Sequence, residues 1–115
     1  MVGFTTRSEV RDGFRVLAFA GDLDVASRRA AREALHGVLQ AGERAVVLDL
    51  SDLGFLDSTG LTVLIHASDE ARQLALPFAI VVPDGLPRRT LALSGLDQDL
   101  RVAQSFEGAV AALSA

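Results

Sequence analysis

Two short apolar runs, RAVVLDL at residues 44–50 and LPFAIVVP at 76–83, constrain the fold of this chain more than any other feature. A nearly continuous apolar run of this length is typical of a strand that is buried on both faces of a sheet. Between the two runs, from residue 58 onward, apolar side chains recur at helical spacing. Buried strands that are joined by a helix should pair in parallel, so the pattern predicts an α/β fold.

The remaining segments extend this pattern in both directions. We expect strands at residues 4–10, 14–21 and 100–105, and helices from Gly21 to Gly42, at 85–96 and at 106–113. Asp12-Gly13, between the first two strands, is a hairpin turn signal, which makes the first strand an antiparallel edge. We therefore predict a single α/β domain over residues 1–115, with a mixed, mostly parallel five-stranded sheet and about four helices.

The composition excludes several classes of enzyme and metal site. All 11 basic residues are arginine, and the absence of lysine excludes a P-loop, a Schiff-base enzyme and a receiver domain of the response-regulator type. The absence of cysteine excludes disulfides, thiol catalysis and thiolate metal sites. His36 and His66 lie in different expected helices, far apart in the sequence, so we expect no metal site and no cofactor.

Charge and hydropathy also limit the partners and the location of the protein. The net charge of −4 argues against direct binding to nucleic acid, which usually requires a basic face. No apolar run approaches the roughly 18 residues that are needed to cross a bilayer. The N-terminus lacks the charged and apolar layout of a signal peptide. We therefore expect a cytoplasmic protein that does not enter a membrane.

The segment DSTG at residues 57–60 stands where the second expected helix begins. Ser58 suits an N-cap, which contributes about 1 kcal/mol, although residue 61 is not the Glu or Gln of a capping box. Gly60 in a first helical turn costs roughly 0.5–1 kcal/mol relative to alanine, and close approach of another molecule would explain it. A helix N-terminus also favours a phosphate. Capping and a functional hydroxyl therefore both remain open for Ser58.

A hydrolytic role for Ser58 is not expected. Leu56 stands where the nucleophile elbow requires a glycine, and no histidine is placed by a recognisable pattern to act as the base.

The segment PDGLPRR at residues 83–89 is a turn that leads into a helix. We expect its side chains Arg88 and Arg89 to be solvated and assign them no chemistry.

Acidic residues follow the second expected strand in the segment AGDLDVAS, at residues 20–27. Asp22 and Asp24 suit the N-terminus of the helix that follows. In a parallel sheet they would also share one edge with Asp57 and Asp52, because the carboxyl ends of the strands meet there. Such an acidic rim would suit a partner that carries arginine or a metal ion.

The sequence resembles a known protein family. The segment VVLDLSDLGFLDSTGLTVLIHA at residues 46–67 is similar to the signature of the STAS domain, in its anti-sigma factor antagonist branch. Nearly the whole chain takes part in the resemblance. The other matching segments are AGDLDVAS, LPFAIVVP, RRTLALSGLD at residues 88–97 and VAQSFEGAVAAL at 102–113.

The resemblance implies a regulator rather than an enzyme. Such proteins bind an anti-sigma factor that is also a serine kinase of the GHKL type, and binding makes it release its sigma factor. The kinase phosphorylates the serine after the motif aspartate, here Ser58, and the phosphorylated form dissociates until a PP2C-type phosphatase restores it. The resemblance also places Asp24 of GDLD on the contact surface, together with Asp57, Thr59 and Gly60, which flank the acceptor. We add Asp22 to the expected partner-binding residues because it belongs to the same acidic rim.

Two departures from the family pattern are conservative. The family often has GELD where this chain has GDLD, and DSSG where it has DSTG, which leaves Thr59 as a possible second acceptor. The resemblance also admits an alternative, a STAS subunit of a stressosome-like or lipid-transport complex. We expect a monomer or weak dimer whose core changes little on phosphorylation.

Overall fold

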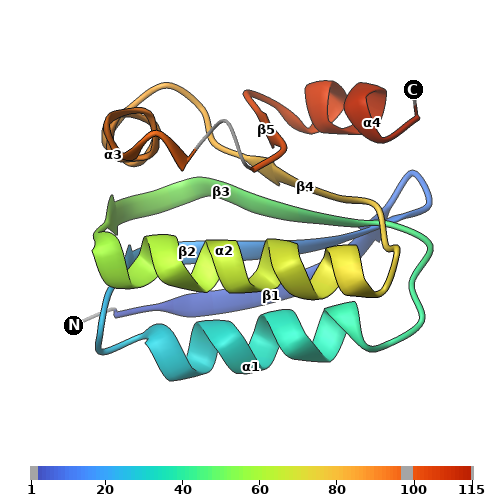
Figure 1. Ribbon diagram of the computed structural model, residues 1–115, viewed down its shortest axis with the longest axis horizontal. Helices are drawn as coiled ribbons and strands as arrows, with labels where there is room; N and C mark the ends of the chain where they lie inside the picture. The colour runs from blue at the N-terminus through green and yellow to red at the C-terminus, as the bar shows by residue number, and fades with distance from the viewer. Residues whose placement is uncertain (1–2, 97–99, 115) are drawn as a thin grey trace.

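A five-stranded sheet forms the centre of the computed structural model, which describes residues 3–96 and 100–114 (Figure 1). The strands lie side by side in chain order and are β1 (Thr5–Arg11), β2 (Phe14–Leu23), β3 (Val46–Leu56), β4 (Phe78–Val81) and β5 (Val102–Ala103). The helices are α1 (Arg28–Leu39), α2 (Ser58–Gln73), α3 (Leu86–Ser94) and α4 (Phe106–Ser114). β1 is antiparallel to β2, and the other pairs are parallel. The predicted fold class is confirmed.

The hairpin between β1 and β2 turns at the residues that the sequence indicates. Asp12 and Gly13 have φ values of 51° and 83°, which a two-residue hairpin turn of the primed type requires. All seven residues of β1 are exposed. Because β1 is an edge strand, charged side chains such as Arg7 and Glu9 hinder its pairing with another chain.

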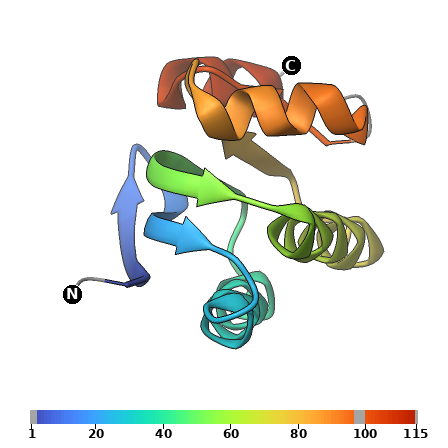
Figure 2. The same cartoon turned by 90° about the vertical axis from the view of Figure 1, so that its left-hand side faces the viewer.

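Helices cover both faces of the sheet. Figure 2 shows α1 and α2 on one side of it and α3 and α4 on the other. Along β3, Val46 and Leu48 belong to the larger core under α1 and α2, and Val47 belongs to a smaller core with Ala109 of α4. This division explains the continuous apolar run in the first half of β3, because both faces of the strand are buried there. Among the described residues, no helix is both long and apolar enough to cross a membrane.

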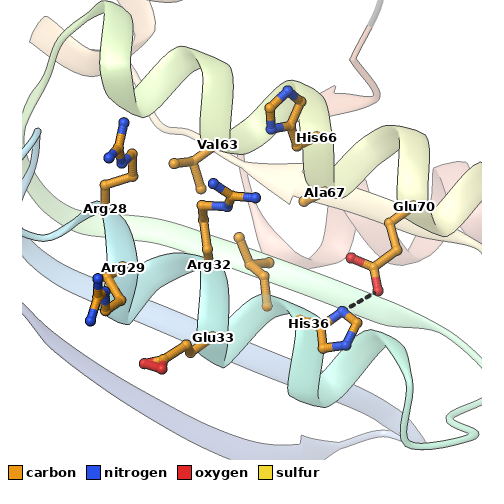
Figure 3. A pocket seen from close by; sticks show the side chains of 10 residues that line it. Arg28, Arg29, Arg32, Glu33, His36, Val63, His66, Ala67 and Glu70 are labelled. Atoms are coloured by element: carbon orange, nitrogen blue, oxygen red, sulfur yellow. Dashed lines mark hydrogen bonds and ion pairs between the residues drawn. The ribbon is translucent and has the colours of Figure 1, made fainter.

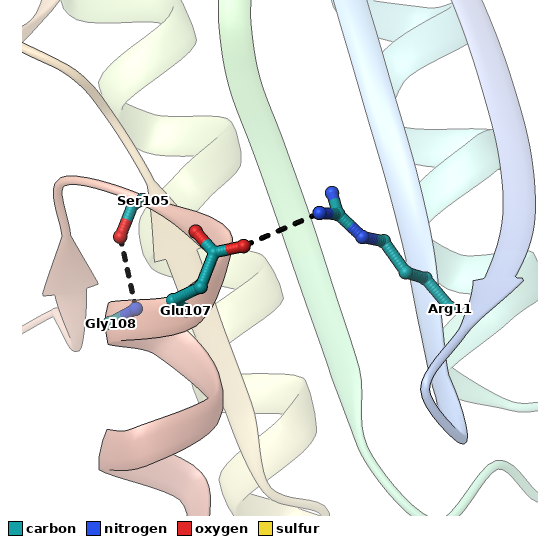
Figure 4. Close-up of polar contacts among 4 residues, drawn as sticks. All are labelled: Arg11, Ser105, Glu107 and Gly108. Atoms are coloured by element: carbon teal, nitrogen blue, oxygen red, sulfur yellow. Dashed lines mark hydrogen bonds and ion pairs between the residues drawn. The ribbon is translucent and has the colours of Figure 1, made fainter.

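The tip of the hairpin is joined to α4 by one arginine (Figure 4). The guanidinium carbon of Arg11 lies 4.2 Å from the centre of the Phe106 ring, and Nη2 lies 3.4 Å from a carboxylate oxygen of Glu107. Ser105 caps α4, because its hydroxyl accepts a hydrogen bond from the Gly108 N–H at 3.0 Å. These contacts hold α4 over its face of the sheet.

The boundaries of several elements differ from the expected ones. β3 was expected to end at residue 50, but it continues to Leu56 because it pairs with β2 along Ala20–Leu23. β2 likewise reaches Leu23, and α1 begins only at Arg28. β4 and β5 are shorter than expected, with four and two residues. Polar residues such as Ser51 and Asp52 look like a loop in the sequence, whereas backbone pairing with β2 makes them strand.

Candidate functional site

The parallel strands β2 and β3 end together at one edge of the sheet, which we call the carboxyl edge. Leu23 and Leu56 are register partners, so the segments that start at Asp24 and Asp57 leave the sheet from neighbouring positions. Figure 2 views the molecule from this end. The expectation that the two acidic segments share one edge is therefore confirmed. Asp52 lies further back, on β3 opposite Ala20.

Asp57, and not Ser58, is the N-cap of α2. Its side-chain Oδ1 accepts a hydrogen bond from the Gly60 N–H at 3.1 Å, and its backbone carbonyl accepts the first helical bond, from Leu61. The cap role that the sequence suggested for Ser58 is therefore wrong. Both residue types are good caps, so the choice depends on where β3 ends. Because β3 runs to Leu56, the cap falls on Asp57.

Because Asp57 is the N-cap, the Ser58 side chain does not cap α2. Ser58 is the first residue of α2 and is exposed, and its hydroxyl makes no hydrogen bond to any residue that the structure describes. Its backbone carbonyl accepts a bond from Thr62 Oγ1 at 3.0 Å. The N–H groups of Ser58 and Thr59 lie in the first turn, where no helical carbonyl precedes them. An anion attached to Ser58 would therefore meet unpaired amide donors and the positive end of the helix.

Gly60 is explained by contacts inside the fold. The residue is buried, and a Cβ placed on it would lie 2.5 Å from Leu56 Cδ1 and 2.8 Å from the carbonyl oxygen of Leu23. The sequence suggested that close approach of another molecule requires this glycine. The close approach is instead that of β2, against which the first turn of α2 packs.

The loop between β2 and α1 is shaped by Asp24 and Ser27. Asp24 Oδ1 accepts hydrogen bonds from the N–H groups of Ala26 at 3.0 Å and Ser27 at 3.2 Å. Ser27 is buried, and its hydroxyl donates to the carbonyl of Asp22 at 2.6 Å and accepts from the N–H of Asp24 at 3.0 Å. Asp22 and Asp24 therefore precede the helix rather than occupy its first turn. Sequence reasoning missed Ser27, whose only signal is a small polar residue next to a helix start.

Exposed apolar side chains accompany the acidic ones at the carboxyl edge. Val25 is 69% exposed in the β2–α1 loop, Phe55 is 47% exposed near the end of β3, and Leu86 is 64% exposed at the start of α3. Phe55 is the register partner of Asp22. Each of the three lies near the carboxyl end of a parallel strand or in the segment that follows it. Sequence reasoning missed these three residues, although apolar residues inside loop-like segments were a visible signal.

Arg88 is not solvated as expected. Its Nη1 donates a hydrogen bond to the carbonyl of Val82 at 2.7 Å, with a longer contact of 3.4 Å to the carbonyl of Ala103. The side chain therefore joins α3 to the ends of β4 and β5. Its neighbour Arg89 is exposed, as expected.

Known proteins with similar sequences and structures identify the family. The family model of the STAS domain matches residues 5–109. Anti-sigma-F factor antagonist RsfB of Mycobacterium tuberculosis is 32% identical over 99 residues, covering 86% of this chain and 80% of that protein. The crystal structure of an anti-sigma factor antagonist from Mycobacterium paratuberculosis has a TM-score of 0.86 at 28% identity, with 98% of this chain and 96% of that one covered.

The phosphorylated form of the Bacillus cell fate determinant SpoIIAA shares the fold. Its TM-score is 0.66 at 21% identity, with 95% of this chain and 99% of that one covered. The family model and the RsfB match agree with the resemblance of the DSTG and GDLD segments. The chain belongs to the STAS domain family, in its anti-sigma factor antagonist branch.

Proposed function

We propose that this protein is an anti-sigma factor antagonist whose binding to an anti-sigma factor is switched off by phosphorylation of Ser58. The relatives that match over most of the chain carry the name anti-sigma factor antagonist. The observation that carries the proposal for Ser58 is its exposed hydroxyl, uncommitted among the described residues, at the first position of α2. The protein then acts by binding, and its partners supply the catalysis.

The proposed contact surface is the carboxyl edge around Ser58. Asp22, Asp24 and Asp57 give it negative charge, which suits arginine or lysine side chains of a partner. Val25 and Phe55 add exposed apolar area at the same place. Thr59, which is partly buried beside Ser58, lies within reach of the same partner. Gly60 contributes no exposed side chain, and its role is to allow the close packing of α2 on β2.

Phosphorylation would act on this surface through charge and size. A phosphoserine carries about −1.5 to −2 charges at neutral pH, here beside the carboxylates of Asp57 and Asp24. The first-turn amides of α2 can hold the phosphate without moving the core. A partner that fits the unmodified surface would then meet a bulky, like-charged group, at a cost of several kcal/mol. That cost corresponds to roughly a hundredfold loss of affinity or more.

The proposal assigns two catalytic partners. A GHKL-type serine kinase, which is the anti-sigma factor itself, would add the phosphate, and a PP2C-type phosphatase would remove it. Both reactions use the same exposed hydroxyl. A regulator of this kind works in the cytoplasm, where sigma factors and ATP are present.

The test combines the purified protein, its cognate anti-sigma factor and ATP. Ser58→Ala should bind the anti-sigma factor as the wild type does and should accept no phosphate, whereas Ser58→Asp should bind at least tenfold more weakly. Thr62→Ala is the matched control, since it removes an exposed hydroxyl one turn further along α2. Intact-mass spectrometry measures phosphorylation, and calorimetry measures binding. Full phosphorylation of Ser58→Ala would assign the acceptor to Thr59 or another residue instead.

A further inference from the structure

A groove lies between α1 and α2 (Figure 3). Its volume is about 450 Å³, within the range of binding sites. Buried apolar side chains of both helices form its floor, among them Leu35 and Val63. Its rim is cationic. The charged and titratable residues that line it are Arg28, Arg29, Arg32, Glu33, His36, His66 and Glu70.

The three arginines stand where a helix disfavours positive charge. Arg28, Arg29 and Arg32 occupy the amino-terminal half of α1, and the first turn of this helix has no acidic residue. Cations are unfavourable at a helix N-terminus, and like charges four residues apart repel each other. None of the three side chains makes an ion pair or hydrogen bond within residues 3–96 and 100–114. Among the described residues, no ion pair or hydrogen bond therefore holds the three guanidinium groups in place.

The acidic residues of the groove lie apart from Arg28 and Arg32, whereas Glu33 lies on the side of α1 that carries Arg29. Figure 3 shows Arg28 and Arg32 extending from α1 towards α2, and Glu33 pointing away from them. Glu70, at the other end of the groove, contacts His36 Nδ1 at 2.8 Å and accepts a hydrogen bond from Gln40 at 2.7 Å. The arginine end of the groove is therefore positive in a chain whose net charge is −4. An anionic ligand fits this end.

The spacing of the arginines indicates the kind of anion. Arg28 and Arg32 are one helical turn apart, a rise of about 6 Å along α1. Two arginine side chains one turn apart can converge on one phosphate, but Figure 3 shows Arg28 and Arg32 as separate groups along the groove. Carboxylates one turn apart on another helix have the same spacing, and each forms paired hydrogen bonds with a guanidinium group. Small apolar side chains of such a helix would rest on the floor and on the arginine stems.

We propose that the α1–α2 groove binds an acidic helical segment of the anti-sigma factor. Both helices start at the carboxyl edge, so the groove begins beside Ser58 and Asp24. A partner held at that edge can extend along the groove, with basic groups over the aspartates and acidic groups over the arginines. The identity of the partner rests on the proposed function, but the chemistry of the groove does not.

The first experiment tests the groove alone. The isotope-labelled full chain is titrated with a synthetic helical peptide that carries glutamates one turn apart along one face. We expect amide shifts concentrated in the first half of α1 and the middle of α2, and weaker binding at high salt. A peptide with glutamine in place of glutamate should leave these amides unchanged. The proposal is overturned by equal shifts with both peptides, by shifts elsewhere, by no shifts at millimolar peptide, or by displacement of the peptide by equimolar inorganic phosphate.

Charge-reversal variants link the groove to the partner. Arg28→Glu/Arg32→Glu should weaken binding of the peptide and of the anti-sigma factor by about tenfold or more. Arg44→Glu/Arg101→Glu is the matched control, with the same change of net charge at exposed positions just before β3 and β5, at the far end of the sheet. Equal effects of the two double variants would overturn the proposal.

The two proposals fail in different ways. If the groove variant loses the peptide but binds the anti-sigma factor as the wild type does, the groove proposal fails and the role of Ser58 stands. If Ser58→Asp leaves binding unchanged while the groove variant weakens it, the phosphorylation switch fails and the groove proposal stands. Unfolding by urea checks that each variant folds.

Discussion

Replacing Gly60 with alanine tests whether this glycine serves the fold or a partner. In an exposed helix the substitution would stabilise the protein by about 0.5–1 kcal/mol, because alanine loses less backbone entropy on folding. At position 60 the new methyl group would lie 2.5 Å from Leu56 Cδ1, 2.8 Å from the carbonyl oxygen of Leu23 and 3.0 Å from Leu23 Cγ. The end of the Leu56 side chain can rotate away. The Leu23 carbonyl cannot, because β2 is paired with β3 at that position.

The magnitude follows from these two opposing effects. Overpacking of a core by a methyl group costs about 1–3 kcal/mol, which exceeds the gain in helix propensity. We therefore expect Gly60→Ala to lower the free energy of unfolding by about 1–2 kcal/mol and the melting temperature by several degrees. Gly37→Ala is the matched control, since Gly37 lies within α1 and no atom of another segment comes within 4 Å of the place that its methyl group would take. That control should raise the free energy of unfolding by about 0.5–1 kcal/mol.

Urea unfolding followed by circular dichroism measures both variants. The reasoning is refuted if Gly60→Ala stabilises the protein as much as Gly37→Ala does. If Gly60→Ala keeps its stability and instead loses binding to the anti-sigma factor, the glycine serves clearance for the partner, as the sequence suggested.

Two further substitutions test the contacts that position the carboxyl edge. Asp57→Ala should lower the free energy of unfolding by about 1 kcal/mol, because the Gly60 N–H loses its acceptor. Asp57→Asn should keep most of this stabilisation, because asparagine is also a good cap. Equal losses for the two variants in urea unfolding would contradict the cap assignment. Arg88→Ala should lower the free energy of unfolding by about 1–2 kcal/mol, because the hydrogen bond to the Val82 carbonyl is lost. Arg89→Ala, at an exposed neighbouring position, should lower it by less than about 0.5 kcal/mol. Thermal unfolding should therefore separate the two variants.

Much of the site could be predicted from the sequence because its signals are local. The order of elements, the hairpin turn at Asp12-Gly13 and the start of a helix at Ser58 follow from periodicity and turn residues within a few positions. The shared edge of the two acidic segments followed from the rule for parallel strands. The placement of Ser58 and Asp24 at the same edge of the sheet needed only this rule and the order of the elements.

The cap could not be assigned in this way, because it depends on strand pairing between distant segments. Asp57 and Ser58 are equally good caps in isolation, and only the extension of β3 along β2 decides between them. The same pairing places the Leu23 carbonyl under Gly60. The partner of Arg88 was also hidden, since the Val82 carbonyl becomes an acceptor only where β4 ends.

By itself, the sequence determined the α/β order, the antiparallel edge and the family, because runs, turns and the DSTG and GDLD segments are local patterns. Tertiary structure alone decided that the Ser58 hydroxyl makes no hydrogen bond within the described part of the chain, that Gly60 is required by β2, and that three arginines line one groove with two histidines from separate helices. The physical reason is the same for all three. Each depends on which atoms of distant segments come within a few ångströms, and that distance is set by strand register and helix packing rather than by neighbouring residues.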